Sequence, residues 1–232
     1  ALNVAVCGAL ADWNRHHYEP EALLQIAMNV EAQVIGVPTG VQDYRPALYG
    51  GVAAVELGIE GVRRVPLDID HAELERRLVL CYTGEPHNSG TNNWEITKRH
   101  IDGDRHVFDC FERIRDTAVA MRSALARSDW DEVGRQIATE WDNRKRLAPG
   151  VSTAVIDDLI SRANGAGATA AKVCGAGGGG CGTLGAGLSD DEVLRDEVEV
   201  VEFLDRLAVG ADDSVVNLVE GSQVCTDGVA FD

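Results

Sequence analysis

The stretch AAKVCGAGGGGC, at residues 170–181, decides how the rest of the sequence is interpreted. An apolar run typical of a β-strand leads directly into GAGGGG at 175–180, which ends in four consecutive glycines. Glycine loses more conformational entropy on ordering than any other residue, so such a run destabilises a fold unless the backbone needs it. Either the glycines form a flexible connector, or something approaches the backbone closely there.

Three other interpretations of the glycine run must be weighed against a turn that a ligand approaches closely. A flexible linker would have polar flanks, whereas these flanks are apolar or small. The pattern G-x-G-x-x-G is present at Gly175, Gly177 and Gly180, but the glycine-rich CGTLGAGL that follows is a poor start for the helix of a dinucleotide-binding fold. A Walker loop would end in Gly-Lys-Ser/Thr, which this run does not. We therefore favour a strand-to-loop turn whose main-chain amides converge on an anion.

The bulk composition is that of an ordinary globular protein, with 45% hydrophobic residues in 232. A net charge of −17 argues against nucleic acid as a partner, because phosphate-backbone binding needs clustered Lys and Arg. No apolar run approaches the roughly 18 residues of a membrane span, and no signal peptide opens the sequence. The six cysteines contain no C-x-x-C pair, so we expect buried free thiols in a reducing, cytoplasmic compartment.

Hydrophobic periodicity predicts helices and strands that are interleaved along the chain, as in α/β or α+β proteins. The predicted helices span residues 1–17, 20–35, 107–125, 130–141, 153–164 and 189–208. The predicted strands span residues 52–57, 63–69, 76–84 and 167–174, with loops at 37–51 and 85–94. Short strands are expected after residue 208.

Several details of these helices can be checked against a structure. One buried face of the helix at 107–125 is expected to carry Val107, Phe111, Ile114, Ala118, Met121 and Leu125. The apolar residues of the helix at 130–141 are Trp130, Val133, Ile137 and Trp141. The first helix has Leu2, Val6, Leu10 and Trp13 on one stripe, which predicts a buried face that begins at the first residue. Ser128 or Asp129 is expected to cap the helix at 130–141, and Ser152 the helix at 153–164.

The quoted stretch resembles the third signature of the GHMP kinase superfamily, Lys-h-x-Gly-Ala-Gly-Gly-Gly-Gly. Residues 21–51, EALLQIAMNVEAQVIGVPTGVQDYRPALYGG, resemble the segment of sugar-type members in which a Glu-bearing helix leads into a Gly-x-x-x-Gly-x-x-Asp loop. The resemblance covers about residues 1–185. It implies an α+β, two-domain GHMP kinase fold. Residues 1–75 would form part of the ribosomal S5 domain 2-like, ATP-side domain, and 76–232 a ferredoxin-like C-terminal domain.

The resemblance also implies an ATP- and Mg²⁺-dependent kinase of a sugar or related small alcohol. Glu31 shares the apolar row of its helix with Leu24 and Met28, so its carboxylate is either paired, partly exposed or a Mg²⁺ ligand, and the family implies the ligand. Asp43 by position alone would be a turn former, but its match to the family loop implies the base that receives the proton of the acceptor hydroxyl.

Further site residues follow from the same two blocks and from one polar segment. The amides expected to hold phosphate, or to join the substrate and nucleotide loops, belong to Gly175, Ala176, Gly177, Gly178 and Gly179. The residues expected to bind the substrate are Gly40, Asp43, His87, Asn88, Ser89, Thr91 and Asn92. Uncharged donors and acceptors of this kind suit a polyol, although they also suit a solvated loop. Lys172 is either a solvated strand residue or part of the site.

Two departures from the family pattern separate the alternatives. An Arg that heptose-phosphate and fucose members place near the polar segment is absent here, which weakens the case for a phosphorylated substrate. The second family signature, Pro-x-x-x-Gly-Leu-Gly-Ser-Ser, is also absent, so we expect the chain to begin just after it and to be inactive alone if it is a fragment. A non-catalytic ligand-binding or sensor protein, and a kinase of mevalonate or homoserine, stay open, as does a homodimer.

Overall fold

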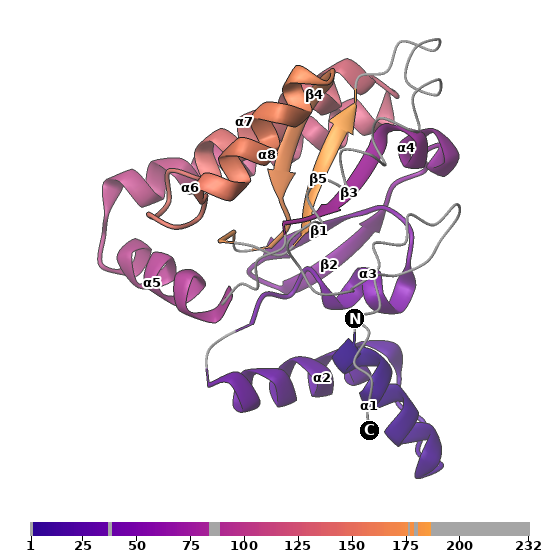
Figure 1. The fold of residues 1–232 in the computed structure, drawn as a ribbon. Coiled ribbons are helices and arrows are strands. Elements are labelled where there is room, and N and C mark those ends of the chain that lie inside the picture. Colours follow the sequence, from indigo (N-terminus) through magenta and orange to yellow (C-terminus); the bar gives the residue numbers. More distant parts are fainter. Residues whose placement is uncertain (1, 37–38, 84–88, 176, 179–180, 187–232) are drawn as a thin grey trace, which may run out of the picture.

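The computed structural model describes residues 2–36, 39–83, 89–175, 177–178 and 181–186 (Figure 1). The helices are α1 (Leu2–Trp13), α2 (Pro20–Ile35), α3 (Tyr44–Tyr49), α4 (His71–Arg77), α5 (Ser89–Ile101), α6 (Arg105–Ala126), α7 (Trp130–Arg144) and α8 (Ala154–Gly165). The strands are β1 (Ala53–Gly58), β2 (Gly61–Pro66), β3 (Leu78–Tyr82), β4 (Ala168–Val173) and β5 (Cys181–Ala186). The helix and the strands predicted after residue 186 lie outside the described residues.

An antiparallel sheet with the strand order β3–β5–β4 forms the centre of the molecule. In its register Thr183 of β5 pairs with Leu80 of β3 on one side and with Lys172 of β4 on the other. The chain therefore turns back on itself directly between β4 and β5, which places the glycine run at one end of the sheet. In Figure 1 that end points toward α1, α2 and α3.

The largest hydrophobic core lies between this sheet and helices α5 to α8 (Figure 1). Its buried members are Ile96, Val107, Cys110, Trp141, Leu147, Val151, Ile156 and Val173. A second cluster joins the middle of β3 and β4 to α8 through Cys81, Leu159, Ala163 and Ala171. The predicted helical periodicity of residues 107–125 is confirmed, although Ala118 is exposed and Cys110, Thr117 and Ala124 are buried in addition to Val107.

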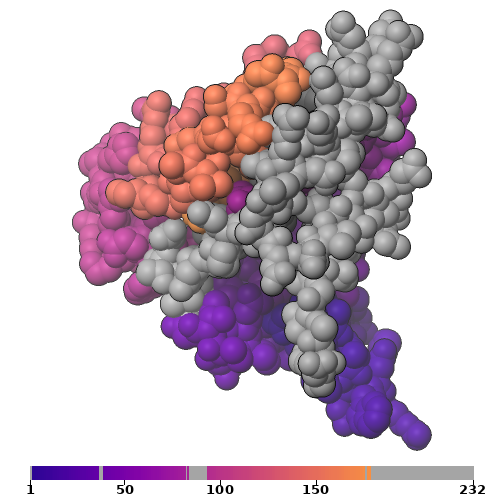
Figure 2. All heavy atoms as spheres, viewed as in Figure 1, coloured from indigo at the N-terminus to yellow at the C-terminus, as the bar shows by residue number. Residues whose placement is uncertain are grey.

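The first three helices enclose a smaller core of Val4, Leu24, Ala27 and Tyr44. The stripe predicted to be the buried face of α1 is instead exposed, with Leu2 at 80% and Trp13 at 85%. Val4, which is buried, and Cys7 pack into the small core in its place. Figure 2 shows these helices projecting from the lower end of the molecule.

Several boundaries differ from the sequence-based predictions. The loop predicted at 37–51 contains the short helix α3, and the loop predicted at 85–94 gives way to α5 at Ser89. The strand predicted from residue 76 begins at Leu78, because His71–Arg77 forms a helix whose Glu73 pairs with Arg76 and Arg77. The first helix ends at Trp13 rather than near residue 17. The predicted domain boundary between residues 75 and 76 lies within α4 and stays a prediction.

The helix caps confirm one prediction and correct another. Asp129 caps α7 by accepting a hydrogen bond from the amide of Glu132, as expected. α8 is capped by Thr153, not by Ser152. The backbone of Thr153 is extended and its hydroxyl accepts from the Ile156 amide at 3.3 Å, whereas the Ser152 hydroxyl donates to the Asp157 carboxylate at 2.6 Å.

The antiparallel β1–β2 hairpin lies between the small core and the sheet (Figure 1). Glu56 of β1 accepts a charge-assisted hydrogen bond from Arg122 of α6 at 2.6 Å, and this bond ties the hairpin to the larger part of the molecule.

Cys81 and Cys110 are buried as predicted, but Cys174 is exposed. Among the residues that the structure describes, no helix combines the length and apolar character that crossing a bilayer requires.

Candidate active site

The glycine turn follows β4 and has a backbone that only glycine adopts easily. Gly175, Gly177 and Gly178 have φ angles of +73°, +81° and +82°. A Cβ added to Gly177 would lie 2.3 Å from the carbonyl oxygen of Val151, so no other side chain fits there. The amide of Gly178 donates to that same carbonyl at 2.9 Å. The loop between α7 and α8 thus anchors the turn.

Because of this anchor, the glycines predicted to supply amides to phosphate fall into two groups: one whose amide is used within the protein and one whose backbone is exposed. The Gly178 amide is used inside the protein, which suits the role of holding loops together rather than that of contacting phosphate. Gly175 is exposed, and nothing lies within 4 Å of the position its Cβ would take. Its backbone is therefore open to a ligand. Ala176 and Gly179 lie outside the described residues.

Lys172, two residues before the turn, is not a solvated side chain. Its ammonium lies 2.9 Å from Glu140 of α7, whose other carboxylate oxygen pairs with Arg144. Burial raises the pKa of Glu140, but the charges of Lys172 and Arg144 outweigh that effect and hold the pKa below its usual value. Glu140 is therefore ionised at neutral pH, and the pair fastens β4 to α7 close to the turn.

Asp43 is the residue before α3, and its side chain is free for chemistry. It occupies the N-cap position, but its carboxylate accepts no capping hydrogen bond from the helix. The side chain is exposed, and the side-chain amide of Gln42 donates a long hydrogen bond to its carboxylate at 3.5 Å. Gly40 is likewise exposed in the segment that leads to it.

Glu31 is half-buried on α2, on the side that faces α1 and α3. The side-chain amide of Asn3 donates to its carboxylate at 3.3 Å and to the carbonyl of Ala27 at 2.6 Å. No Lys or Arg of the described residues pairs with Glu31, so the ion-pair interpretation of this carboxylate finds no partner there. An oriented carboxylate without a cation is what a metal ligand requires.

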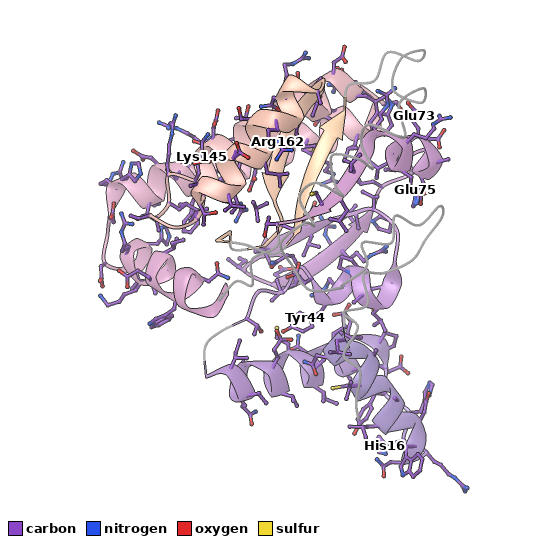
Figure 3. All side chains as sticks on the ribbon, in the orientation of Figure 1. His16, Tyr44, Glu73, Glu75, Lys145 and Arg162 are labelled. Carbon is purple, nitrogen blue, oxygen red and sulfur yellow. The ribbon has the colours of Figure 1, made fainter. Side chains whose placement is uncertain are left out.

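Tyr44 brings the two carboxylates into one local environment. Figure 3 shows this side chain between α2 and the β1–β2 hairpin. Burial is the main cause that raises the pKa of Tyr44; the Thr39 hydroxyl lowers it, and the Glu31 and Asp43 carboxylates raise it further. The Tyr44 and Thr39 hydroxyls are both buried, and neither has a well-formed hydrogen bond within the described ranges. Two acids and two hydroxyls therefore gather at the junction of α2 and α3.

The carboxylates at this junction suit Mg²⁺, and they are too few for a metal ion that is held wholly by protein side chains. Among the residues described, no three His, Cys, Asp or Glu side chains are close enough to form a metal cluster. Mg²⁺ needs only one or two carboxylates, because water and phosphate oxygens complete its octahedron. Glu31, held by Asn3 and lacking a cationic partner, fits that requirement.

The predicted substrate segment is described only in part. His87 and Asn88 lie outside the described residues. Ser89, Thr91 and Asn92 lie in the first turn of α5, which was predicted to be a loop. The prediction that these residues bind a polyol therefore stays a prediction.

The structure adds neighbours that the sequence did not indicate: Asn3, Thr39, Tyr44 and Arg45. Asn3 and Glu31 are 28 residues apart, and no periodicity predicts a contact over that distance. Tyr44 and Arg45 lay in a predicted loop, where burial was not expected, yet they are 6% and 4% exposed. A helical pattern of six residues is too short to be recognised from sequence.

Comparison with known proteins assigns the chain to a family. The model described as GHMP kinases N terminal domain matches residues 1–51, and the one described as GHMP kinases C terminal matches residues 121–198. Together they cover more than half of the chain.

Two curated proteins show the relationship at the level of sequence. D-glycero-alpha-D-manno-heptose 7-phosphate kinase of Campylobacter jejuni is 28% identical over 185 residues, 77% of this chain and 53% of that protein. Mevalonate kinase of Methanothermobacter thermautotrophicus is 29% identical over 181 residues, 78% of this chain and 56% of that protein. The chain thus spans about half the length of these relatives.

Solved structures show the same fold. L. major mevalonate kinase in complex with R-mevalonate has a TM-score of 0.67 at 22% identity, over 88% of this chain and 59% of that one. Lactococcus lactis galactokinase complexed with galactose has a TM-score of 0.65 at 19% identity, over 90% of this chain and 61% of that one. With the two family models, this α+β fold shows that the chain belongs to the GHMP kinase family.

Proposed function

We propose that the full-length protein is an ATP- and Mg²⁺-dependent kinase that transfers the γ-phosphate to a hydroxyl of a sugar or sugar derivative. The observation that carries the proposal is the geometry at the junction of α2 and α3, where Glu31, held by the Asn3 amide, and the uncapped Asp43 flank the buried Tyr44. A carboxylate oriented for a cation and an exposed carboxylate without a structural task are the two groups that this reaction needs. Family membership and the curated relatives, a heptose phosphate kinase among them, support the same class of reaction.

In this proposal Asp43 accepts the proton of the acceptor hydroxyl. Phosphoryl transfer has a loose transition state, so positioning and charge neutralisation do most of the work and an ordinary carboxylate suffices as a base. Glu31 would hold Mg²⁺, which when bound neutralises charge on the phosphates. The exposed backbone at Gly175 would approach phosphate oxygens, while Gly177 and Gly178 keep the turn in place through Val151. Gly40 and the segment at 87–92 would contact the acceptor.

The decisive variant is Asp43→Asn in the full-length protein. We expect kcat to fall by about 10²–10⁴-fold, because the amide cannot accept the proton. Affinity for ATP, measured by calorimetry, should stay within about twofold, since transfer fails after binding. Asp109→Asn, on the exposed side of α6, is the matched control and should leave kcat unchanged. A kcat within about threefold of the wild type in Asp43→Asn would remove the base assignment.

Glu31→Gln tests the metal assignment separately. The variant should need a higher Mg²⁺ concentration for half-maximal turnover, and direct Mn²⁺ binding in the presence of nucleotide should weaken in parallel. Unaltered metal dependence would count against Glu31 as a ligand.

A panel of acceptors assayed for ADP release separates the candidate substrates. Sugars, sugar phosphates, mevalonate and homoserine belong in the panel, because the curated relatives include both a heptose phosphate kinase and a mevalonate kinase. Turnover with a sugar supports the proposal, turnover with mevalonate or homoserine replaces the acceptor class, and ligand binding without turnover favours a sensor.

A further inference from the structure

Arg45 is a buried cation on α3, two residues after Asp43, and nothing in the proposed chemistry uses it. Its side chain is 5% exposed in a chain that carries a net charge of −17. Burying a guanidinium costs free energy unless its donors are satisfied, and the Nε of Arg45 is buried without a partner among the described residues. A charge kept under such conditions calls for an explanation beyond stability.

The remaining donors of Arg45 connect the segment before Asp43 to α2. One terminal nitrogen donates to the Val41 carbonyl at 3.3 Å, and the other lies 2.7 Å from the carboxylate of Glu21. Glu21 belongs to the first turn of α2, the helix that also carries Glu31. The planar guanidinium can hold two acceptors at fixed angles, which an ammonium cannot do.

A second residue of α3 supports the same anchor. Tyr49, one helical turn after Arg45, donates its hydroxyl to the other oxygen of Glu21 at 3.1 Å. The guanidinium of Arg64, on β2, lies 5.3 Å from the Tyr49 ring and donates to the Gly50 carbonyl at 2.8 Å. Two side chains of α3 therefore hydrogen-bond to the Glu21 carboxylate, and Arg64 of the hairpin contacts the end of α3.

From this geometry we propose that Arg45 is a positioning residue: held by Glu21, it fixes the Val41 carbonyl and so the placement of Gly40 and Asp43 against Glu31. The inference rests on the proposed kinase function and names a residue that acts on its catalytic base without touching substrate. Asp43 receives no cap bond from α3, so the hydrogen bond between Arg45 and the Val41 carbonyl is what ties the backbone of the segment before Asp43 to a side chain of that helix.

The first test compares Arg45→Lys and Arg45→Met with the wild type. We expect kcat to fall about tenfold in Arg45→Lys and about 100-fold in Arg45→Met, since small displacements of a catalytic group cost factors of this order. The KM for ATP should stay within about twofold, because Arg45 contacts Val41 and Glu21 and none of the residues proposed to hold phosphate or Mg²⁺. Arg115→Met, an exposed arginine of α6, is the control and should change neither quantity. A loss of thermal stability with unchanged kcat would overturn the proposal.

The partner residue gives a test that does not depend on the folding of the arginine variants. Glu21 is 54% exposed, so Glu21→Gln should fold, and we expect kcat to fall about threefold because a neutral acceptor holds the guanidinium less firmly. In the double variant Glu21→Gln/Arg45→Met, kcat should equal that of Arg45→Met alone. Additive losses would mean that Glu21 acts independently, which contradicts the anchor.

Amide hydrogen exchange separates this inference from the proposed function. Exchange of residues 40–44 should quicken in Arg45→Met and stay unchanged in Arg115→Met, whether or not an acceptor is known. If the wild type turns over no acceptor, the kinase proposal fails while faster exchange still supports the anchor. Unchanged exchange at 40–44 overturns the anchor even in an active enzyme.

Discussion

Among the residues that the structure describes, the buried core around the first three helices consists of four residues, whereas the sheet and the helices α5 to α8 enclose two clusters with twelve between them. The glycine turn belongs to the second region and is anchored by main-chain contacts to Val151. The candidate carboxylates belong to the first, where Asn3 and Arg45 hold the local structure through polar contacts. A main-chain hydrogen bond to a residue of the large core therefore supports the proposed phosphate turn, whereas side-chain hydrogen bonds support the proposed base and metal ligand.

This difference matches the demands of the two sites. A turn with consecutive left-handed glycines gains from a rigid support, because its bare backbone has no side chains of its own to pack. Carboxylates that serve a metal ion and a proton need polar neighbours, which a hydrophobic core would exclude. Because it has fewer buried apolar contacts, the region of α1 to α3 should have the lower local stability, and motion during a catalytic cycle is expected there first.

The contact between the turn and Val151 gives the largest expected effect on stability. Gly177→Ala places a Cβ 2.3 Å from a carbonyl oxygen at a φ of +81°, and we expect a loss of about 5 kcal/mol or a failure to fold. Gly150→Ala is the control, since its φ of +85° is similar and nothing lies within 4 Å. It should cost only about 1–2 kcal/mol. Equal losses in urea unfolding would show that backbone conformation, not the anchor, sets the cost.

A pair of core truncations tests the contrast in packing directly. Ile156→Ala, at a fully buried site among eight core residues, should lower the free energy of unfolding by about 4 kcal/mol. Leu24→Ala, in the four-residue core, should cost about 2 kcal/mol, because partly exposed neighbours can relax into the space. Losses of the same size in chemical denaturation would mean that the two regions are packed alike.

The ion pair between Glu140 and Lys172, on the edge strand β4, should contribute less to the free energy of unfolding than the core residues do, and its contribution should depend on pH. Glu140→Gln should cost about 2 kcal/mol at pH 7, because Lys172 is left half-buried without its charge partner. The folded-state pKa of Glu140 lies below the usual 4.5, so the carboxylate stabilises the fold above that pH and loses this contribution as the pH falls through the folded-state value.

The difference between wild type and Glu140→Gln should therefore shrink below about pH 4.5, which unfolding curves from pH 3 to 7 would measure. Glu112→Gln, on the exposed side of α6, should stay within about 0.5 kcal/mol at every pH. A difference that is constant with pH would show that the ion pair contributes nothing.

The long helices and the strand before the glycine run were predictable because periodicity is a local property, whereas β5, the central strand directly after the run, was not predicted because its glycine-rich sequence shows no alternation. Val107 and Trp141 are buried as their spacing requires. The short helix α3 was missed because six residues show no period, and the stripe of α1 was placed on the wrong side because the sequence does not say which neighbour a face meets. Thr153 and Ser152 are both acceptable caps, and only the contact of Ser152 with Asp157 decides between them.

The site was predictable only as far as its residue types. Glu31 and Asp43 stood out through the family pattern, but their common neighbour Tyr44 depends on how α2 meets α3. The anchor formed by Arg45 joins residues 24 positions apart through two side-chain bonds. Such contacts depend on tertiary placement, which no pattern along one chain encodes.

The link between Gly177 and Val151 has an uneven consequence for sequence variation. Every amino acid carries a carbonyl, so residue 151 can change its side chain as far as the surrounding core allows and still hold the turn. Residue 177 has no such latitude, because even one methyl group collides with that oxygen. Among distant relatives, position 177 should therefore always be glycine, whereas the residue type at position 151 should vary. Comparing residue types across relatives will then reveal position 177 but not its partner.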